Sequence, residues 1–274
     1  MIAVVVVGVM DDHGDISVSK RVIVQVISCL VMIYYGKVRI NDFGDLVGFG
    51  QPITFGGLES VITVFCVVGV INALNLIDGI DGLCSIVCLV AFAGMLTLVK
   101  LAGAPTSVSL ILYFGASLLA FLIVNLGLTK MLVKKVFLGD AGTTIIGFFL
   151  SWYLIHMSSG ADAVFRPITA VWLLALPIMD TLAVMYRRIR LHQSPFQAGR
   201  DHIHHQLMNF GFSPKKTLLI LIFFSMTLAG VGVLCEIKEV PEPIMFFGML
   251  VLFFLYCVGS GKLHLEAQIM RDRG

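Results

Sequence analysis

Charged residues are scarce in this sequence. Only 13% of the 274 residues are Asp, Glu, Lys or Arg, whereas an ordinary soluble domain contains about 25%. This deficit excludes an ordinary soluble globular protein. Cysteine is also sparse, and all six cysteines fall within or at the ends of apolar runs. We expect them to be small packing residues, not disulfide partners or thiol metal ligands.

The apolar residues, 58% of the chain, come in separate runs. Apart from the first, which is shorter, the runs are about 18 to 22 residues long, the length that an α-helix needs to cross roughly 30 Å of hydrocarbon. We therefore predict an all-α polytopic membrane protein with a single integral-membrane domain over residues 1–274. The eight predicted transmembrane helices lie near residues 22–36, 58–76, 83–101, 107–126, 142–159, 166–186, 217–235 and 243–261.

The chain begins with a shorter apolar run, MIAVVVVGVM, over residues 1–10. Ten helical residues rise about 15 Å, which is half of a bilayer. The run lacks the basic N-terminal region and the small-residue cleavage site of a signal peptide. It is therefore predicted to be a partial helix whose first half is absent, in an N-terminally truncated chain.

The loops between the predicted helices divide into two sets that face opposite sides of the membrane. The set formed by residues 11–21, 76–82, 127–141, 187–216 and 262–274 holds 14 of the 19 Lys and Arg residues. Because positively charged loops stay in the cytoplasm, this set is predicted to be cytoplasmic. The same set holds nearly all of the acidic and histidine clusters, which predicts an active site at the cytoplasmic edge of the membrane.

Asp78 and Asp81 stand three residues apart in the sequence NALNLIDGIDGL, at the end of an apolar run. Residues with this spacing share one face of a helix. A carboxylate at membrane depth costs roughly 2.5–3.5 kcal/mol, so acids in such places usually serve a function. Asn75 adds a neutral oxygen to the same face. A solvated helix terminus is the alternative interpretation.

Two further acidic motifs lie in the same set of loops. Asp11 and Asp12 follow residues 1–10 directly, and they form either a solvated acidic loop or a site for a cation or a phosphate. Asp140, in FLGDAGTT, precedes a predicted helix. It fits a helix N-cap as well as a site at which amides and glycines approach phosphate oxygens. Asp180 lies about a turn and a half inside the same edge.

The segment RDHIHH contains three histidines next to an arginine: Arg200, His202, His204 and His205. A zinc site is one interpretation, but neither a cysteine nor an HExxH motif accompanies these histidines. A solvated polar loop is another, and a site for an anionic sugar nucleotide is the one we favour. Since Mg²⁺ binds one or two carboxylates together with substrate phosphates, the clusters predict a Mg²⁺-dependent transfer that involves a lipid phosphate.

With these motifs in this order, the sequence resembles the polyprenyl-phosphate N-acetylhexosamine-1-phosphate transferase family. The resemblance covers essentially the whole chain and rests on GVMDDHGDISV, NALNLIDGIDGL, KVFLGDAGTTIIGF, PIMDTLAVMYRR and SPFQAGRDHIHHQLMNFGF. Ile203 interrupts the run of three histidines that phospho-MurNAc-pentapeptide transferases carry. The sequence is therefore more similar to the branch of the family that uses UDP-GlcNAc.

The resemblance implies an enzyme of the bacterial inner membrane that transfers GlcNAc-1-phosphate from UDP-GlcNAc to undecaprenyl phosphate and releases UMP. This reaction is the first membrane step of lipopolysaccharide O-antigen and enterobacterial common antigen synthesis. The implied cofactor is Mg²⁺, with Mn²⁺ as a substitute. The implied partners are the two substrates and the lipid bilayer, without nucleic acid, and a homodimer is left open beside a monomer.

The resemblance also implies roles for individual residues. The implied catalytic residues are Asp11, Asp12, Asp78 and Asp81, with Asp11 as the base. The implied metal ligands are Asp140 and Asn75. The implied substrate-binding residues are Phe137, which would stack on uracil, and Arg200, His202, His204 and His205, which would hold the sugar diphosphate. Family members carry about two more helices before the point that matches Met1, in line with the predicted truncation.

Three alternatives stay open from the sequence. The first is the same chemistry with another UDP-N-acetylhexosamine. An intramembrane prenyltransferase is the second, but it would use NxxxDxxxD, whereas Asn75, Asp78 and Asp81 are spaced three apart. An ion-coupled transporter is the third, but it would place acids near the bilayer midplane and contain internal repeats, whereas these acids lie at one edge and no repeat is found.

Overall fold

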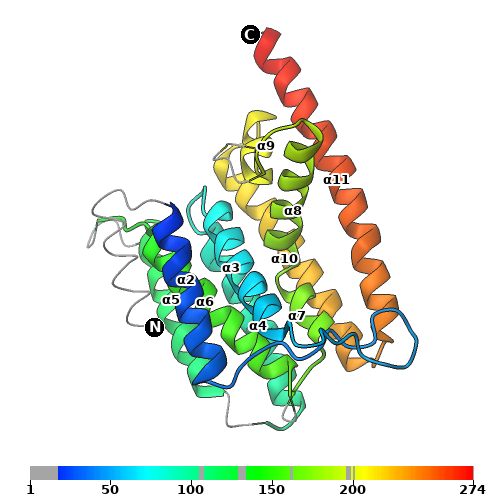
Figure 1. Cartoon of the computed structure of the whole chain (residues 1–274). Helices are drawn as coiled ribbons and strands as arrows, with labels where there is room; N and C mark the ends of the chain where they lie inside the picture. Colours follow the sequence, from blue (N-terminus) through cyan, green and yellow to red (C-terminus); the bar gives the residue numbers. More distant parts are fainter. Residues whose placement is uncertain are drawn as a thin grey trace.

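The computed structural model is a bundle of helices (Figure 1). It describes residues 18–104, 108–128, 134–160, 163–195, 199 and 201–273. Residues 1–10, Asp11, Asp12 and Arg200, for which the sequence made predictions, lie outside this described part. The helices are α2 (Val18–Tyr34), α3 (Glu59–Ile77), α4 (Leu83–Leu101), α5 (Val108–Asn125), α6 (Gly139–Ser158), α7 (Pro167–Leu173), α8 (Ala175–Arg190), α9 (Ile203–Asn209), α10 (Pro214–Ile237) and α11 (Glu242–Arg273).

A helical segment lies at each of the eight predicted spans, which confirms the all-α polytopic membrane fold. Among the described residues, five helices are long and apolar enough to cross a membrane: α3, α4, α5, α10 and the Glu242–Leu263 part of α11. The bent pair α7 and α8 makes a sixth if it is taken as one span. The predicted number of eight is not confirmed, because α2 has only 17 residues and α6 begins with the polar sequence GDAGTT.

The predicted span over residues 166–186 is broken. α7 ends at Leu173, α8 begins at Ala175, and the two helices meet at an angle of 81°. Pro177 explains the break, because in a continuous helix proline has no N–H for the carbonyl of Leu173 and its ring would clash with that carbonyl. The break sets the direction in which α8 runs toward α9 (Figure 1).

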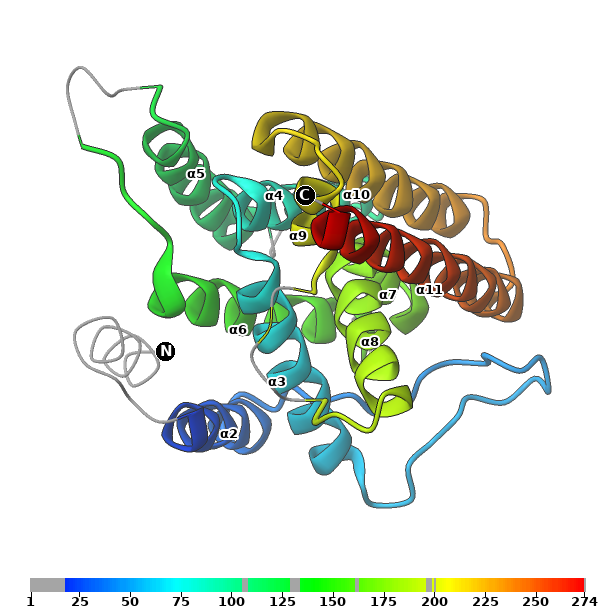
Figure 2. The ribbon, with the colours of Figure 1, turned by 90° about the horizontal axis from the view of Figure 1, so that it is seen from above.

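The core is centred on α4, whose residues Val87, Ala91 and Met95 have no exposed surface. Seen from above, α3 lies between α6 and α8 (Figure 2). Glycine permits the closest of these approaches, because a Cβ on Gly147 of α6 would lie 3.0 Å from the Cα of Ile71 in α3. The packed core therefore holds the ends of α3, α4, α6 and α8 in fixed positions relative to one another.

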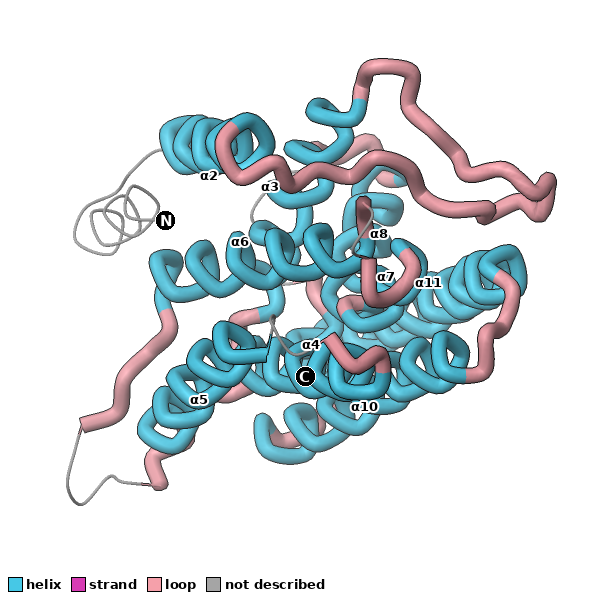
Figure 3. The backbone as a smooth tube through the Cα atoms, turned by 90° about the horizontal axis from the view of Figure 1, so that it is seen from below, coloured by secondary structure: helices cyan, strands magenta, loops and turns pink. Residues whose placement is uncertain are grey.

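The loop between α2 and α3 crosses the end of the bundle that lies away from α9 (Figures 1 and 3). The Asp45 carboxylate accepts hydrogen bonds from the amides of Gly48, Phe49 and Gly50 at 2.8, 3.0 and 2.9 Å. The Asp45 amide donates to Glu242 at the start of α11. The loop is thus tied to α11 at the end of the molecule opposite the histidine segment.

Candidate active site

The turn between α3 and α4 places two of the predicted carboxylates at one end of the bundle. α3 ends at Ile77, and the amide of Asp78 donates to the Asn75 carbonyl at 3.3 Å. Gly82 then adopts a φ of +79°, directly before α4 begins. Glycine favours this left-handed conformation because it has no Cβ. The turn is therefore short, and it keeps Asp78 and Asp81 close together.

Asp140 joins these carboxylates from the first turn of α6. Its Oδ1 accepts a hydrogen bond of 2.6 Å from Asn75 Nδ2, which also donates to Thr143 Oγ1 at 3.1 Å. Its Oδ2 forms an ion pair with Arg21 of α2. Three helices that are far apart in the sequence thus meet at one carboxylate.

The three carboxylates of this acidic cluster (Asp78, Asp81 and Asp140) affect one another. Burial, followed by the negative charges of Asp140 and Asp81, raises the pKa of Asp78 to about 6. A cation placed among the three groups would favour the ionised form of Asp78, since an opposite charge stabilises a carboxylate. The acidic cluster therefore has the electrostatic character of a cation site.

Asp81 lies on the more exposed side of the cluster, where it forms an ion pair with Lys135. The Nζ atom of Lys135 also lies 5.3 Å from the centre of the Phe137 ring, within the range of a cation–π contact. Asn125, the last residue of α5, fixes this segment by donating to the Val136 carbonyl at 2.8 Å. The Phe137 side chain is 71% exposed and thus open to a planar ligand.

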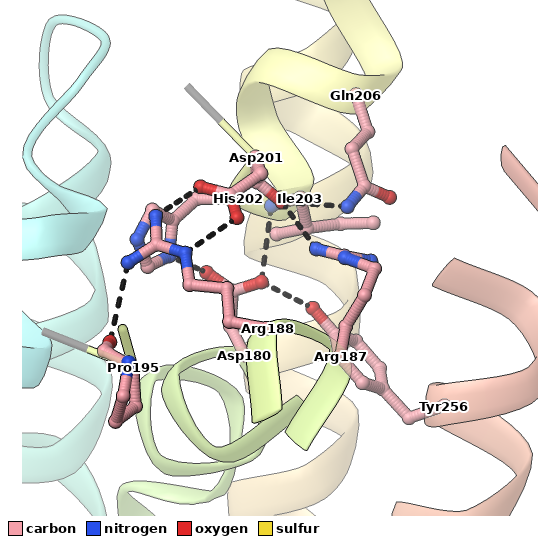
Figure 4. Close-up of polar contacts among 9 residues, drawn as sticks. All are labelled: Asp180, Arg187, Arg188, Pro195, Asp201, His202, Ile203, Gln206 and Tyr256. Carbon is pink, nitrogen blue, oxygen red and sulfur yellow. Dashed lines mark hydrogen bonds and ion pairs between the residues drawn. The ribbon is translucent and has the colours of Figure 1, made fainter. Parts of the chain in front are cut away.

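A second group of polar residues lies where α8, α9 and α11 meet (Figure 4). His202 Nδ1 is 2.8 Å from Asp180 Oδ2. Asp180 Oδ1 accepts hydrogen bonds from the Ile203 amide at 3.0 Å and from the Tyr256 hydroxyl at 2.9 Å. The Asp180 and His202 side chains are each only 3% exposed, and a buried carboxylate needs such partners. Because His202 is the N-cap residue of α9, these contacts fix the start of the helix.

The residue before His202 is held by arginine. Arg188 Nε and Nη2 donate to the two carboxylate oxygens of Asp201 at 2.9 and 2.5 Å. The Asp201 carbonyl accepts from Arg187 at 2.7 Å and from Gln206 at 2.6 Å (Figure 4). Burial by itself would raise the pKa of Asp201, but the bond to Arg188 and the nearby positive charges lower it below its ordinary value. Asp201 is thus an anion engaged by its arginine partner.

His204 connects the histidine segment with the acidic cluster. It packs against the α3–α4 turn so closely that a Cβ on Gly79 would lie 1.9 Å from His204 Nε2. Burial, with a smaller contribution from His205, lowers the pKa of His204 to about 4, so the ring is neutral at pH 7. Among the described residues, neither nitrogen of His204 has a hydrogen-bond partner, and neither does His202 Nε2. Buried polar atoms without partners are unfavourable, and a polar ligand would satisfy them.

The acidic cluster fits a divalent cation that is shared with a substrate. Within the described part of the chain, no group of three or more His, Cys, Asp or Glu side chains is placed to hold a metal ion by itself. Mg²⁺ does not need one, because it binds through one or two carboxylates, waters and substrate phosphates. Asp140, one of the two predicted ligands, is a suitable carboxylate with Asp78 near it, and Asn75, the other predicted ligand, donates to Asp140 through its amide nitrogen.

Comparisons with known proteins agree with this geometry. The undecaprenyl-phosphate alpha-N-acetylglucosaminyl 1-phosphate transferase of Haemophilus influenzae is 39% identical over 250 residues, which cover 91% of this chain and 70% of that relative. The proteins of the same name from Salmonella typhi and Escherichia coli K12 are 38% and 37% identical over 253 residues, 92% of this chain and 68% of each relative. The sequence profile of glycosyl transferase family 4 matches residues 1–158. The chain belongs to glycosyl transferase family 4.

Membership of glycosyl transferase family 4 confirms the resemblance that the motifs indicated, and the chain is a transferase. The structure brings together five of the predicted site residues at the acidic cluster: Asn75, Asp78, Asp81, Phe137 and Asp140. It places His202, His204 and His205 at the neighbouring junction. The roles of all these residues stay predictions.

Several residues of this family 4 transferase that contact the predicted ones were missed by sequence reasoning. From the sequence, Arg21 and Lys135 have no predicted role beyond the positive charge that they add to the predicted cytoplasmic loops. The sequence places Asp180 near the same edge without assigning it a role, although an acid within a predicted span is usually functional. Tyr256 carries no such signal, since it is one aromatic residue in a long apolar helix. These contacts join segments that are distant in the sequence.

Proposed function

We propose that this family 4 transferase moves GlcNAc-1-phosphate from UDP-GlcNAc to undecaprenyl phosphate, with undecaprenyl-diphospho-GlcNAc and UMP as products. The observation that carries the proposal is the shared name of relatives that are 37–39% identical to the chain and cover more than nine-tenths of it. The acidic cluster supports it, because phosphoryl transfer depends on positioning and on neutralising charge.

In the proposed reaction, an oxygen of the lipid phosphate attacks the β-phosphorus of UDP-GlcNAc. A P–O bond forms between them, the P–O bond to the α-phosphate breaks, and UMP leaves with the electron pair. Negative charge therefore gathers on the attacking and leaving groups, and fixed positive charges nearby lower the barrier. Arg21 and Lys135, which contact Asp140 and Asp81, are cations in the right place for this.

The proposal includes Mg²⁺, with Mn²⁺ as a substitute. Asp140 and Asn75 would hold the ion, with the Asp78 carboxylate near them. Asn75 would offer its amide oxygen, because its Nδ2 is the atom that donates to Asp140 at 2.6 Å. When bound, the ion would neutralise charge on the diphosphate. The electrostatic support is the pKa of Asp78, which burial raises first and the negative charges of Asp140 and Asp81 raise further.

The remaining predicted residues fit the donor substrate. The exposed ring of Phe137 suits stacking on uracil. The buried nitrogens of His202 and His204 suit the sugar diphosphate, whose oxygens would give them partners. We place this site at the cytoplasmic face of the bacterial inner membrane, because the loops on its side carry 14 of the 19 Lys and Arg residues.

Transfer of radiolabel tests the proposal. Membranes containing the chain, from a strain without its own GlcNAc-1-phosphate transferase, are given UDP-[³H]GlcNAc and undecaprenyl phosphate. We expect label in the organic phase and an equal amount of UMP. Unlabelled UDP-GalNAc and UDP-MurNAc-pentapeptide should compete poorly. Absence of lipid-linked label, with the chain present in the membrane, would refute the proposal, and strong competition by UDP-GalNAc would change the assigned sugar.

A further inference from the structure

The environment of His202 is asymmetric. Its Nδ1 is bonded to Asp180, and both side chains are buried. Its Nε2 is equally buried, yet among the described residues it has no hydrogen-bond partner. A contact that served only to attach α9 to α8 would not require a second, unsatisfied polar atom, which is unfavourable in the absence of a ligand. His202 Nε2 is therefore the atom of this pair that is available to a ligand.

Asp180 determines which nitrogen of His202 is available. A carboxylate is an acceptor only, so the His202 nitrogen that faces it must carry a proton. Asp180 is itself held in place by donors from two elements, the amide of Ile203 in α9 and the hydroxyl of Tyr256 in α11 (Figure 4). It cannot turn away without breaking these bonds. An imidazole ring with both nitrogens protonated donates from each of them, here to Asp180 through Nδ1 and to a ligand through Nε2.

The surroundings favour an anionic ligand for this donor. The ring of His202 lies 6.3 Å from that of His204, which in turn contacts Gly79, the residue next to Asp78. The two arginines near the start of α9 are engaged by Asp201, Arg188 by its carboxylate and Arg187 by its carbonyl. His202 is therefore the ring at this junction whose Nδ1 is fixed by a carboxylate and whose other nitrogen is not bonded within the described structure.

We propose that Asp180 is a positioning residue of the transfer reaction: it holds His202 by Nδ1–H, so that Nε2–H meets an anionic oxygen of the nucleotide-sugar diphosphate. The inference rests on the proposed function and deepens it. Asp180 does not touch the substrate itself. Its effect on transfer passes through His202, and Tyr256 contributes only by holding the second oxygen of Asp180.

Replacement of His202 by asparagine distinguishes the roles of the two ring nitrogens. The asparagine Nδ2 can take the place of His202 Nδ1 and donate to Asp180, but nothing replaces Nε2. We expect His202→Asn to accumulate in the membrane and unfold at the same temperature as the wild type. Its transfer activity should fall by about 30-fold or more, the scale of a lost charged contact to the reacting phosphates. A variant within threefold of wild-type activity would show that the histidine serves only to attach α9, and would overturn the proposal.

Replacement of Asp180 by asparagine tests whether its effect passes through His202. In the wild-type background, Asp180→Asn should lower transfer about tenfold or more and raise the KM for UDP-GlcNAc, with little change in the KM for undecaprenyl phosphate. In the His202→Asn background, the same change should cost less than twofold, because coupled residues are not additive. Tyr256→Phe is the matched control, which removes one hydrogen bond from the same carboxylate and should cost at most about threefold.

Equal losses from Asp180→Asn in the two backgrounds would overturn the proposal, since Asp180 would then act independently of His202. If Asp180→Asn fails to accumulate, the result of His202→Asn decides alone. The transfer activity of the wild-type chain distinguishes a failure of this inference from a failure of the proposed function. Without transfer by the wild type the proposed function fails, whereas transfer by the wild type with additive variants removes only the role of Asp180.

Discussion

Single residues determine how this site responds to pH, and Asp78 is the first of them. Its pKa in the folded chain is about 6, compared with an ordinary value of 3.8. Between these values the folded chain binds more protons than the unfolded chain, so the free energy of unfolding decreases as the pH rises from about 4 to 6. Above pH 6 the full penalty of the buried charge is present.

Asp78→Asn should therefore stabilise the metal-free protein at pH 8 and leave it unchanged at pH 4. The expected increase in Tm at pH 8 is about 3 °C, the shift that roughly 1 kcal/mol produces in a chain of this size. Thermal unfolding in detergent with EDTA measures it. The control is Asp81→Asn, which loses the ion pair with Lys135 and should gain nothing. An equal change in Tm at both pH values would contradict the pKa of Asp78.

His204 responds to pH in the opposite direction. Its pKa of about 4 in the folded chain lies below the ordinary value of 6.5. The unfolded chain therefore binds more protons between pH 6.5 and 4, and stability that is complete above pH 6.5 is lost as the pH falls toward 4. His204→Gln should reduce the loss of stability in this window, by at most about 1.4 kcal/mol per pH unit. The same acid dependence in wild type and variant would show that His204 is not responsible.

At this scale, the sequence predicts which segments carry the candidate site, but it does not predict the partners of the individual residues. The helical period predicts that Asn75, Asp78 and Asp81 share one helix face, but this is wrong for Asp81, because α3 ends at Ile77 and the turn before α4 brings the two carboxylates together. The contacts of Asp140 with Arg21 and of Asp180 with Tyr256 join segments that are distant in the sequence. No local pattern contains that information, because it depends on how the helices pack.

Among the structural elements, the contact between the α3–α4 turn and α9 joins the two halves of the site. Gly79→Ala would place a methyl group 1.9 Å from the present position of His204 Nε2, so the His204 ring, or α9 with it, would have to shift. We expect transfer to fall about tenfold or more. In a His204→Ala background, which removes the ring, the same change should have almost no further effect.

The control for Gly79→Ala is Gly115→Ala in α5, where an added Cβ meets nothing within 4 Å and activity should stay at the wild-type level. Radiolabel transfer measures all four variants, with the amount of protein in the membrane determined in parallel. Loss of activity from Gly79→Ala in the His204→Ala background, as large as in the wild type, would mean that the contact is not the cause.

The helices themselves are largely predictable, and their interruptions are less so. Apolar runs of spanning length locate a helical segment at each of the eight predicted places. The break between α7 and α8 is different, because Pro177 is visible in the sequence but many membrane helices tolerate proline. Whether the helix only bends or separates into two helices at an angle of 81° depends on which neighbouring groups form hydrogen bonds with the backbone at the break.

The whole molecule has two different ends, which the proposed orientation assigns to the two sides of the membrane. The α2–α3 loop lies at one end, and the α8–α9 connection lies at the other (Figure 1). Gly50→Cys in the first and Gln193→Cys in the second are both exposed positions. In intact cells, a membrane-impermeant maleimide should label Gly50→Cys and should reach Gln193→Cys only after permeabilisation.

The native chain is the control for this labelling, because all six of its cysteines are buried or half-buried. Labelling of Gln193→Cys in intact cells, with Gly50→Cys protected, would reverse the proposed orientation.

The sequence predicts that the acidic and histidine motifs gather at one edge, from the alternation of spans and from loop charge. The described residues of these motifs do lie at one end of the structure, and the side of the membrane is what the labelling decides.

The acidic cluster is the centre of the proposed transfer site, and Asp140→Asn tests it most directly. The purified wild-type chain and the variant are each given UDP-[³H]GlcNAc and undecaprenyl phosphate, with Mg²⁺ or with EDTA. We expect the wild type to form labelled lipid only with the metal ion, and the variant to keep its helical content but lose about 100-fold or more of the turnover. A variant within about threefold of the wild type, roughly 0.65 kcal/mol of barrier, would show that Asp140 only supports the start of α6, and would contradict a transfer site built on these carboxylates.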